Sequence, residues 1–374
     1  MRDPNFFQTL WFVLIGVLWV GYFILEGFDF GVGILLRLIG RSTAEKRAII
    51  HTIGPVWDGN EVWLLTAGGA TFAAFPGWYA SLFSGFYLAL FLILVALIIR
   101  GVSFEFWGKD DAPAWRATWE WTTLVGSLLA ALLWGVGWAD IVHGVAMNSA
   151  HNVTATLWDL LHPYALLGGL VTLSLFTLHG AIFLTLRLRG ELLERARAAA
   201  AALMPLTLVL LVGFLVWTAF DQPNGGGVKA SAQVIALAAI ACAVGAMFSL
   251  RAQREGRAFA LSSATIALLF ISLFAELFPA ALPSTTSGAF TLTLAGASST
   301  HYTLVVMTVV AVIFVPVVLF YQSWSYWVFR HRLGVEEFEG TPTPIAVLQS
   351  KLGDGNATTP ADGDGGSPTA PTAA

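Results

Sequence analysis

The sequence predicts an all-α integral membrane protein with nine membrane-spanning helices. Of its 374 residues, 57% are hydrophobic and only 11% are charged, whereas soluble globular proteins contain about 25% charged residues. A chain of this composition lacks the polar residues needed to cover a water-facing surface of its size. A formal net charge of −4 and a single cysteine argue against a nucleic-acid-binding surface and against a disulfide framework.

The spans are predicted from stretches of about 20 predominantly apolar residues, which are long enough to cross the hydrocarbon core of a bilayer. The first stretch carries acidic residues and lacks the basic start and cleavage site of a signal peptide, so we expect it to act as an anchor. Two later stretches contain Pro205 or Pro316, which membrane helices tolerate because their neighbours satisfy the freed backbone groups. The predicted spans are residues 9–36, 51–75, 79–100, 119–141, 160–187, 201–220, 231–250, 259–279 and 303–329.

Lysines and arginines indicate the orientation of these spans. All of them except Arg2 and Lys229 lie in the segments that follow the first, third, fifth, seventh and ninth spans. Cytoplasmic loops of membrane proteins carry an excess of basic residues. The pattern therefore predicts an N-terminus outside the cell and a C-terminus in the cytoplasm.

Two regions are expected along the chain, a nine-helix membrane domain over residues 1–335 and a cytoplasmic tail over 336–374. From about Gly353 the tail is rich in Gly, Thr, Pro and Asp. Such a composition cannot bury enough apolar surface to fold. We expect the tail to be disordered.

Four carboxylates stand well inside the first two predicted spans: Glu26, Asp29, Asp58 and Glu61. An acid at the centre of a membrane helix costs about 2.5–3.5 kcal/mol on insertion scales, so its presence indicates function. Each pair is spaced i, i+3, which places both members on one helix face. Asp29 lies about 12 Å and Asp58 about 10 Å from the cytoplasmic boundary, at 1.5 Å per residue. The two pairs are expected to face each other at one level.

This acidic cluster has two interpretations. Clustered carboxylates in a low dielectric can take up and release protons, which favours proton or ion handling. Alternatively, the acids form a static network with Arg37, His51 or Asn60, or with a partner chain. Acids at the ends of spans are expected to be solvated at the interface; these are Glu120, Asp140, Asp159 and Glu276.

No cofactor or metal is expected to bind this chain directly. Haem ligands are His and Met, or Cys, and His179 is the one histidine well inside a span. A single helix histidine is more often hydrogen-bonded than ligating. Haem binding through His179 or through a histidine at a span edge is an alternative that an absorption spectrum would test. The sequence contains no CxxCH motif and no phosphate-binding glycine loop, and we expect no catalytic residue in this chain.

Several motifs resemble subunit II of the cytochrome bd quinol oxidases. The resemblance is strongest over about residues 20–135 and is mainly topological to about 335. The motif WDGNEVWL is long and specific. The similar segments are residues 27–33, 55–64, 66–70, 84–87 and 116–121.

The resemblance implies two four-helix bundles plus one further helix, paired pseudo-symmetrically with a subunit I that carries two b-type haems and one d-type haem. Together the subunits would oxidise quinol and reduce dioxygen to water in the respiratory chain of a bacterial cell membrane. Subunit II would stabilise subunit I and supply a cytoplasmic proton-uptake path. By resemblance, the acid that lines the proton route is Asp58, and the acids Glu26 and Asp29 of the first span belong to the same route. We expect Trp57 and Asn60 to fix the environment of Asp58. Glu61 is expected to belong to the same acidic cluster.

Further partners follow from the resemblance: membrane lipids, a small single-helix accessory subunit, and a structural quinone or lipid in this subunit. Nucleic acid is not expected as a partner. The alternative function is a stand-alone proton-coupled secondary transporter that uses the acidic cluster as its coupling site. The sequence does not show the pair of broken helices, one in each matching half, that many transporters have.

Overall fold

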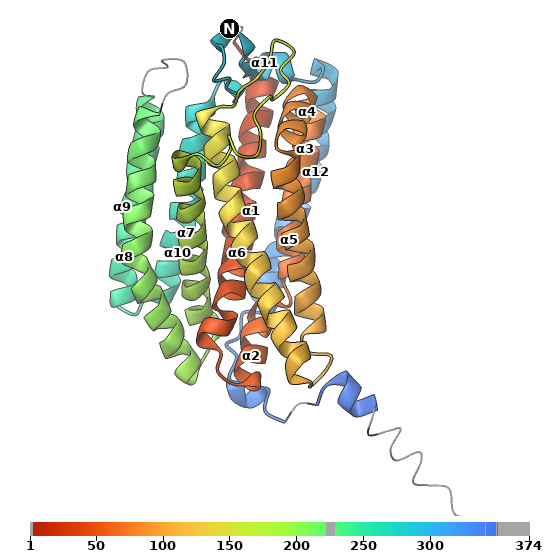
Figure 1. Ribbon diagram of the computed structural model, residues 1–374, viewed down its shortest axis with the longest axis vertical. Helices are drawn as coiled ribbons and strands as arrows, with labels where there is room; N and C mark the ends of the chain where they lie inside the picture. Colours follow the sequence, from red (N-terminus) through yellow and green to blue (C-terminus); the bar gives the residue numbers. More distant parts are fainter. Residues whose placement is uncertain (1–2, 222–228, 341, 349, 351–374) are drawn as a thin grey trace, which may run out of the picture.

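In the computed structural model, which describes residues 3–221, 229–340, 342–348 and 350, long helices run side by side along one axis (Figure 1). The central helix is α1, which contacts α3, α6, α7 and α10. The helices are α1 (Phe6–Ile39), α2 (Thr43–Ile53), α3 (Trp57–Ala74), α4 (Pro76–Gly85), α5 (Tyr87–Phe106), α6 (Pro113–His143), α7 (Pro163–Arg187), α8 (Gly190–Phe220), α9 (Ala230–Arg251), α10 (Glu255–Leu277), α11 (Leu294–Ala297) and α12 (His301–Val328).

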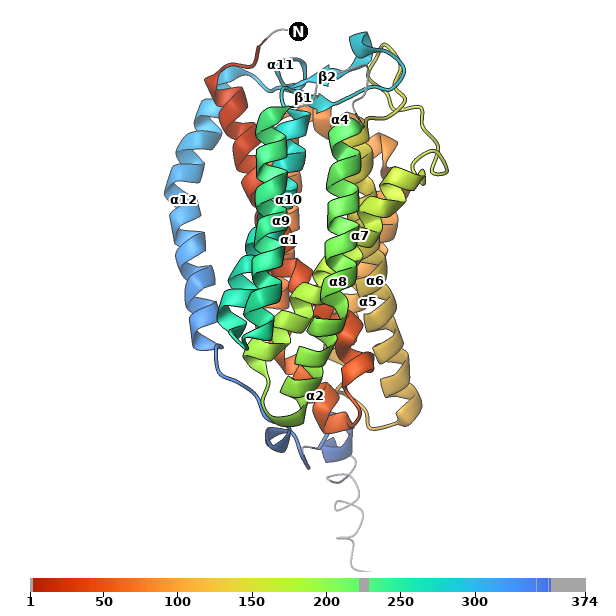
Figure 2. The ribbon, with the colours of Figure 1, turned by 90° about the vertical axis from the view of Figure 1, so that its left-hand side faces the viewer.

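The two ends of the bundle differ. Strands β1 (Ala280–Leu282) and β2 (Leu292–Thr293) pair antiparallel at the end near the N-terminus, here called the sheet end (Figure 2). The short helix α2 lies at the opposite end, here called the α2 end (Figure 1). Short 3₁₀ helices occur at Gly288–Phe290 and Val335–Glu337.

Eight helices of the described chain are long and apolar enough to cross a membrane: α1, α5, α6, α7, α8, α9, α10 and α12. The predicted span 51–75 is not one continuous helix. It is divided into the end of α2 and α3, because Pro55 has no amide N–H to continue the ladder and α2 ends at Ile53. Helix α3 carries Asp58, Asn60 and Glu61 and is not among the eight. The predicted span 79–100 is likewise divided at Phe86 into α4 and α5.

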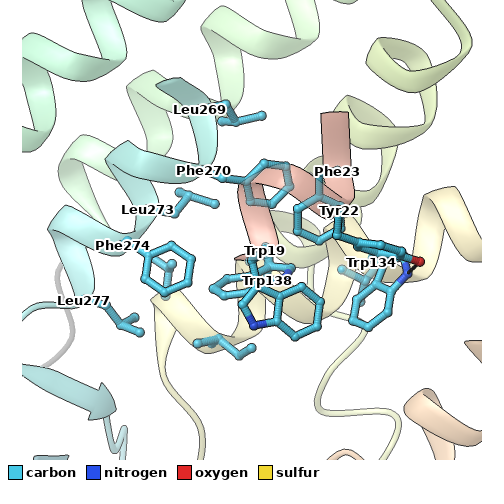
Figure 3. Packing of buried hydrophobic residues seen from close by; sticks show 14 of the residues in the cluster. Trp19, Tyr22, Phe23, Trp134, Trp138, Leu269, Phe270, Leu273, Phe274 and Leu277 are labelled. Carbon is cyan, nitrogen blue, oxygen red and sulfur yellow. Dashed lines mark hydrogen bonds between the residues drawn. The ribbon is translucent and has the colours of Figure 1, made fainter. Parts of the chain in front are cut away.

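Aromatic side chains fill the centre of the bundle (Figure 3). Phe23 of α1 stacks on Phe270 of α10, with 4.0 Å between ring centroids. Trp19 meets Trp134 of α6 edge-on at 5.1 Å, and the Trp134 indole N–H donates to the Tyr22 hydroxyl at 3.1 Å. Each such pair contributes about 0.5–1.5 kcal/mol beyond the area that it buries. This cluster fixes α1 against α6 and α10.

Glycines set the contact between α1 and α7. A Cβ at Gly31 would stand 2.1 Å from the Phe176 carbonyl oxygen, and one at Gly180 would stand 2.5 Å from the Gly31 carbonyl carbon. The two backbones therefore touch, as small residues permit in membrane helices. The glycine-rich segment 27–33 thus allows α1 to approach α7 closely, and this contact fixes the helix that carries Glu26 and Asp29.

Two acids expected to be solvated are buried. Glu120 is 5% exposed, and its carboxylate accepts hydrogen bonds from Lys46 Nζ at 2.9 Å and Arg37 Nη1 at 3.2 Å. Asp140 is 1% exposed, and His162 Nε2 lies 3.1 Å from its Oδ1. Both acids lie toward the ends of α6, but neighbouring side chains cover them. Asp159 is exposed, as expected.

The chain after α12 packs on the α2 end. The Leu333 amide donates to the Arg187 carbonyl at 2.7 Å, and Phe338 lies against the His51 ring with centroids 4.7 Å apart. Thr343 donates its hydroxyl proton to Asp111 at 2.8 Å. The tail was expected to be disordered over 336–374, but its described residues continue these contacts as far as Thr343. Residues 351–374 lie outside the described residues.

Candidate functional site

The acids of α1 lie inside the bundle. Glu26 and Asp29 are both fully buried, and the first turns of α3 pack beside them. Asn60 of α3 donates its amide to Asp29 Oδ2 at 2.7 Å. Its own oxygen accepts from the Tyr326 hydroxyl at 2.7 Å and from Gln322 at 3.1 Å, both on α12. Hydrogen bonds therefore run from α12 through α3 to α1. The pairing of an α1 acid with Asn60, which the static-network interpretation predicted, is present.

A buried arginine that the sequence placed in a cytoplasmic loop is the cation of this site. Arg100 has no exposed surface, because α5 continues past the predicted span end at 100 to Phe106. Its guanidinium donates to Glu26 Oε1 and lies 3.8 Å from Glu61 Oε2. The guanidinium also stands over the Phe30 ring at 4.7 Å, which is a favourable cation–π geometry.

The pairings proposed for Arg37 and His51 do not form. Arg37 binds Glu120 instead, and His51 Nδ1 bonds to the Arg47 carbonyl at 3.0 Å within α2. A signal for Arg100 was present in the sequence: intramembrane acids require a cation or a proton nearby, and Arg100 ends the most apolar part of α5.

The cluster has unused hydrogen-bonding capacity. Among the described residues, no hydrogen-bond partner reaches Glu26 Oε2, Asp29 Oδ1, or the Nε and Nη1 groups of Arg100. Buried polar groups are normally satisfied by protein or by ordered water. These atoms therefore still need an ordered water or a further polar group to complete their hydrogen bonds.

Asp58 differs from the other acids. It is exposed on the outer surface of α3, and no hydrogen bond or ion pair joins it to another residue in the described part of the chain. Trp57 beside it packs against Phe104 of α5, with ring centroids 5.7 Å apart. Glu61 lies between the buried acids of α1 and the exposed Asp58, and its side chain is 24% exposed. The structure thus brings Glu26, Asp29 and Glu61 together and leaves Asp58 at the surface.

A second feature is an apolar cavity of about 480 Å³ between α3, α4, α5 and α6. Aromatic rings form much of its wall, among them Trp19, Trp78, Tyr79, Phe83, Trp134 and Trp138. Its shape and chemistry suit a flat ring or a hydrocarbon chain.

His179 is fully buried, and both of its ring nitrogens are engaged. Nδ1 lies 2.8 Å from Ser262 Oγ and Nε2 lies 3.2 Å from the Ile24 carbonyl. This leaves no nitrogen for a haem iron. In the described chain no group of three or more His, Cys, Asp or Glu is placed to hold a metal ion.

The geometry can be compared with known proteins. Residues 7–329 match the family model for cytochrome bd terminal oxidase subunit II. The chain belongs to that family. It is 40% identical over 330 residues to the cytochrome bd ubiquinol oxidase subunit 2 of Bacillus subtilis (strain 168), covering 88% of this chain and 98% of the relative. It is 36% identical over 372 residues to the cytochrome bd-I ubiquinol oxidase subunit 2 of Escherichia coli (strain K12), covering 91% and 98%.

The fold agrees with a solved structure. A chain of the bd oxidase from Geobacillus thermodenitrificans superposes with a TM-score of 0.71 at 16% identity, covering 87% of this chain and 99% of that chain. The family expected from the sequence motifs is confirmed. The protein is a subunit of a haem-containing quinol oxidase complex of the respiratory chain, and a subunit II implies a partner subunit I. With its eight apolar helices, it is a multi-pass protein of the bacterial cytoplasmic membrane.

Proposed function

We propose that this subunit carries cytoplasmic protons toward the oxygen-reducing site of subunit I. The observation that carries the proposal is the buried cluster around Arg100, where Glu26 and Asp29 retain oxygens without hydrogen-bond partners among the described residues. Protons would enter from the α2 end and pass through Asp29, Glu26 and Asp58 into the partner. Asn60 holds Asp29, and Trp57 holds the first turn of α3.

The outer surface of α3 around Asp58 supports a role in stabilising subunit I. An exposed carboxylate on an intramembrane helix is unfavourable against lipid, so Asp58 favours a protein neighbour over α3. Helix α12, beside it, has only Leu304 buried along its length among the residues described. We therefore place subunit I on the face formed by α3 and α12, where it would cover Asp58.

The topology that this function requires has nine spans, with α3 as the ninth, the N-terminus outside and the C-terminus in the cytoplasm. The positive-inside rule supports it, because Arg37, Lys46, Arg116 and Arg195 all lie at the α2 end. The α2 end is then the cytoplasmic side, where protons are taken up.

The complex would bind its redox groups in subunit I, namely two b-type haems and one d-type haem, with quinol and dioxygen as substrates. In this subunit the apolar cavity beside Trp134 would take a structural quinone or a lipid. A small single-helix accessory subunit would complete the assembly.

The proton role is tested by Asp58→Asn in the purified complex. We expect normal haem spectra and assembly with slowed oxygen consumption, because an amide accepts and releases no proton. Asp159→Asn, which changes an exposed acid at the sheet end, is the matched control. Wild-type oxygen consumption by Asp58→Asn would refute the proton role, and loss of the haems would favour the structural interpretation.

The stand-alone transporter is not favoured, since the relatives are named as oxidase subunits. A haem protein that copurifies with this chain is the expected result. A chain that purifies alone and moves a solute in liposomes would reverse the choice.

A further inference from the structure

At the sheet end, four titratable side chains from three helices meet away from the acidic cluster. His143 ends α6, Asp221 caps α8 and His162 caps α7, while Asp140 stands one turn before His143. His143 Nδ1 lies 2.6 Å from Asp221 Oδ2, and His162 Nε2 lies 3.1 Å from Asp140 Oδ1. We call these four residues the clasp.

The two pairs of the clasp touch each other. The imidazole rings of His143 and His162 have centroids 4.5 Å apart, and Tyr164 of α7 packs parallel to His162 at 6.1 Å. The Tyr164 hydroxyl bonds to Thr218 of α8 at 2.9 Å. One network therefore joins the ends of α6, α7 and α8, which lie side by side (Figure 2).

The burial of Asp140 determines which charges the clasp requires. Its side chain is 2% exposed, and no hydrogen bond from the described residues reaches Oδ2. A carboxylate that deep requires a cation or a proton. The other charged groups near the clasp are Glu276 of α10 and Lys229. Lys229 donates to the Phe278 carbonyl at 2.6 Å, so its ammonium caps α10 rather than pairing with Asp140.

We propose that the clasp is a proton-binding site that locks the sheet ends of α6, α7 and α8 together. With both imidazoles protonated, two carboxylates face two cations and the network is neutral. When the imidazoles lose their protons, a buried and a half-buried carboxylate are left facing each other without cations. The clasp therefore holds the three helix ends together less strongly as the pH at the sheet end rises and the imidazolium charges are lost.

The geometry separates this site from the acidic cluster. The clasp lies where α6 and α8 end and α7 begins, and these helix ends are at the opposite end of the bundle from α2 (Figure 1). None of its four residues takes part in the bonds around Arg100. Its state can be read from stability alone, without turnover, so the test is independent of the proton-uptake role.

The test is the melting temperature of the purified complex, followed by tryptophan fluorescence between pH 6 and pH 8.5. For the wild type we expect a fall of about 3 °C or more across this range. In His143→Gln/His162→Gln the melting temperature at pH 6 should drop and its dependence on pH should flatten. His331→Gln, an exposed histidine at the α2 end, is the matched control and should keep the wild-type slope.

A second variant keeps the test decisive if the double glutamine variant fails to assemble. Asp140→Asn/Asp221→Asn removes both carboxylates and keeps their shape, so it should fold and show the same flattened dependence on pH. A wild-type slope in either double variant would overturn the proposal.

Discussion

The ion pair between Arg100 and Glu26 gives the sharpest prediction, because both side chains are fully buried. Arg100→Met leaves Glu26 as a buried charge without its cation. Breaking a buried pair in this way costs about 3–5 kcal/mol. With an unfolding entropy of about 2.1 cal/mol/K per residue, this chain of 374 residues should lose about 4–6 °C in melting temperature.

The double variant Glu26→Gln/Arg100→Met separates charge from packing. Replacing both partners of a buried ion pair by neutral groups of similar volume is often close to neutral for stability, so the double variant should recover most of the lost stability. The assay is thermal unfolding of the complex, with haem content measured in parallel. An Arg100→Met complex as stable as the wild type, or a double variant no better than the single one, would refute the reasoning.

Three further predictions follow from other contacts. Glu120→Gln weakens its bonds to two basic side chains, and we expect a loss of about 1–3 kcal/mol in thermal unfolding; an unchanged melting temperature would contradict this. Gly31→Ala drives a methyl group into a backbone oxygen of α7 and should cost about 1–3 kcal/mol or more, whereas Gly137→Ala, with open space around it, should be neutral. At the α2 end a hydrogen bond from Arg195 lowers the pKa of Glu45 to about 2 from its ordinary value of 4.5. The stabilisation is therefore present above pH 4.5 and lost as the pH falls toward 2. Glu45→Gln should melt with less dependence on acid over that range, and a wild-type dependence would argue against the pair.

The spans that were predicted well are those made of one uninterrupted apolar run. Residues 160–187 and 259–279 were expected, and α7 (Pro163–Arg187) and α10 (Glu255–Leu277) are found. Apolar length decides these helices almost alone. The break before α3 was missed because a count of apolar residues tolerates Pro55, whereas the backbone ladder does not.

The acids of the buried cluster were predicted from the sequence, but its cation, Arg100, was not. Glu26 and Arg100 are 74 residues apart in the chain, so their contact depends on how α5 packs, which no local pattern encodes. An arginine at the end of an apolar run looks like a loop residue by the positive-inside rule. Here the helix continues for another turn and a half, to Phe106, and turns the guanidinium inward.

The expectation that all four acids face one another fails for a reason of helix geometry. At 3.6 residues per turn, Asp58 and Asn60 point about 200° apart around α3. Since Asn60 is buried against Asp29, Asp58 must point outward, as observed.

Glu61 lies about 60° from Asp58 around the same helix, at the boundary between the surface and the bundle, and it stands within 3.8 Å of Arg100. One turn of α3 thus carries Asn60, which is bonded to the interior, Glu61, which lies at the boundary, and Asp58, which is exposed toward a neighbouring subunit. In the proposed proton path Asn60 holds Asp29 in place, while Glu61 and Asp58 are the carboxylates that lead outward. The break at Gly54–Val56 sets where that turn begins, so the first turn of α3 connects the buried cluster to the proposed subunit interface.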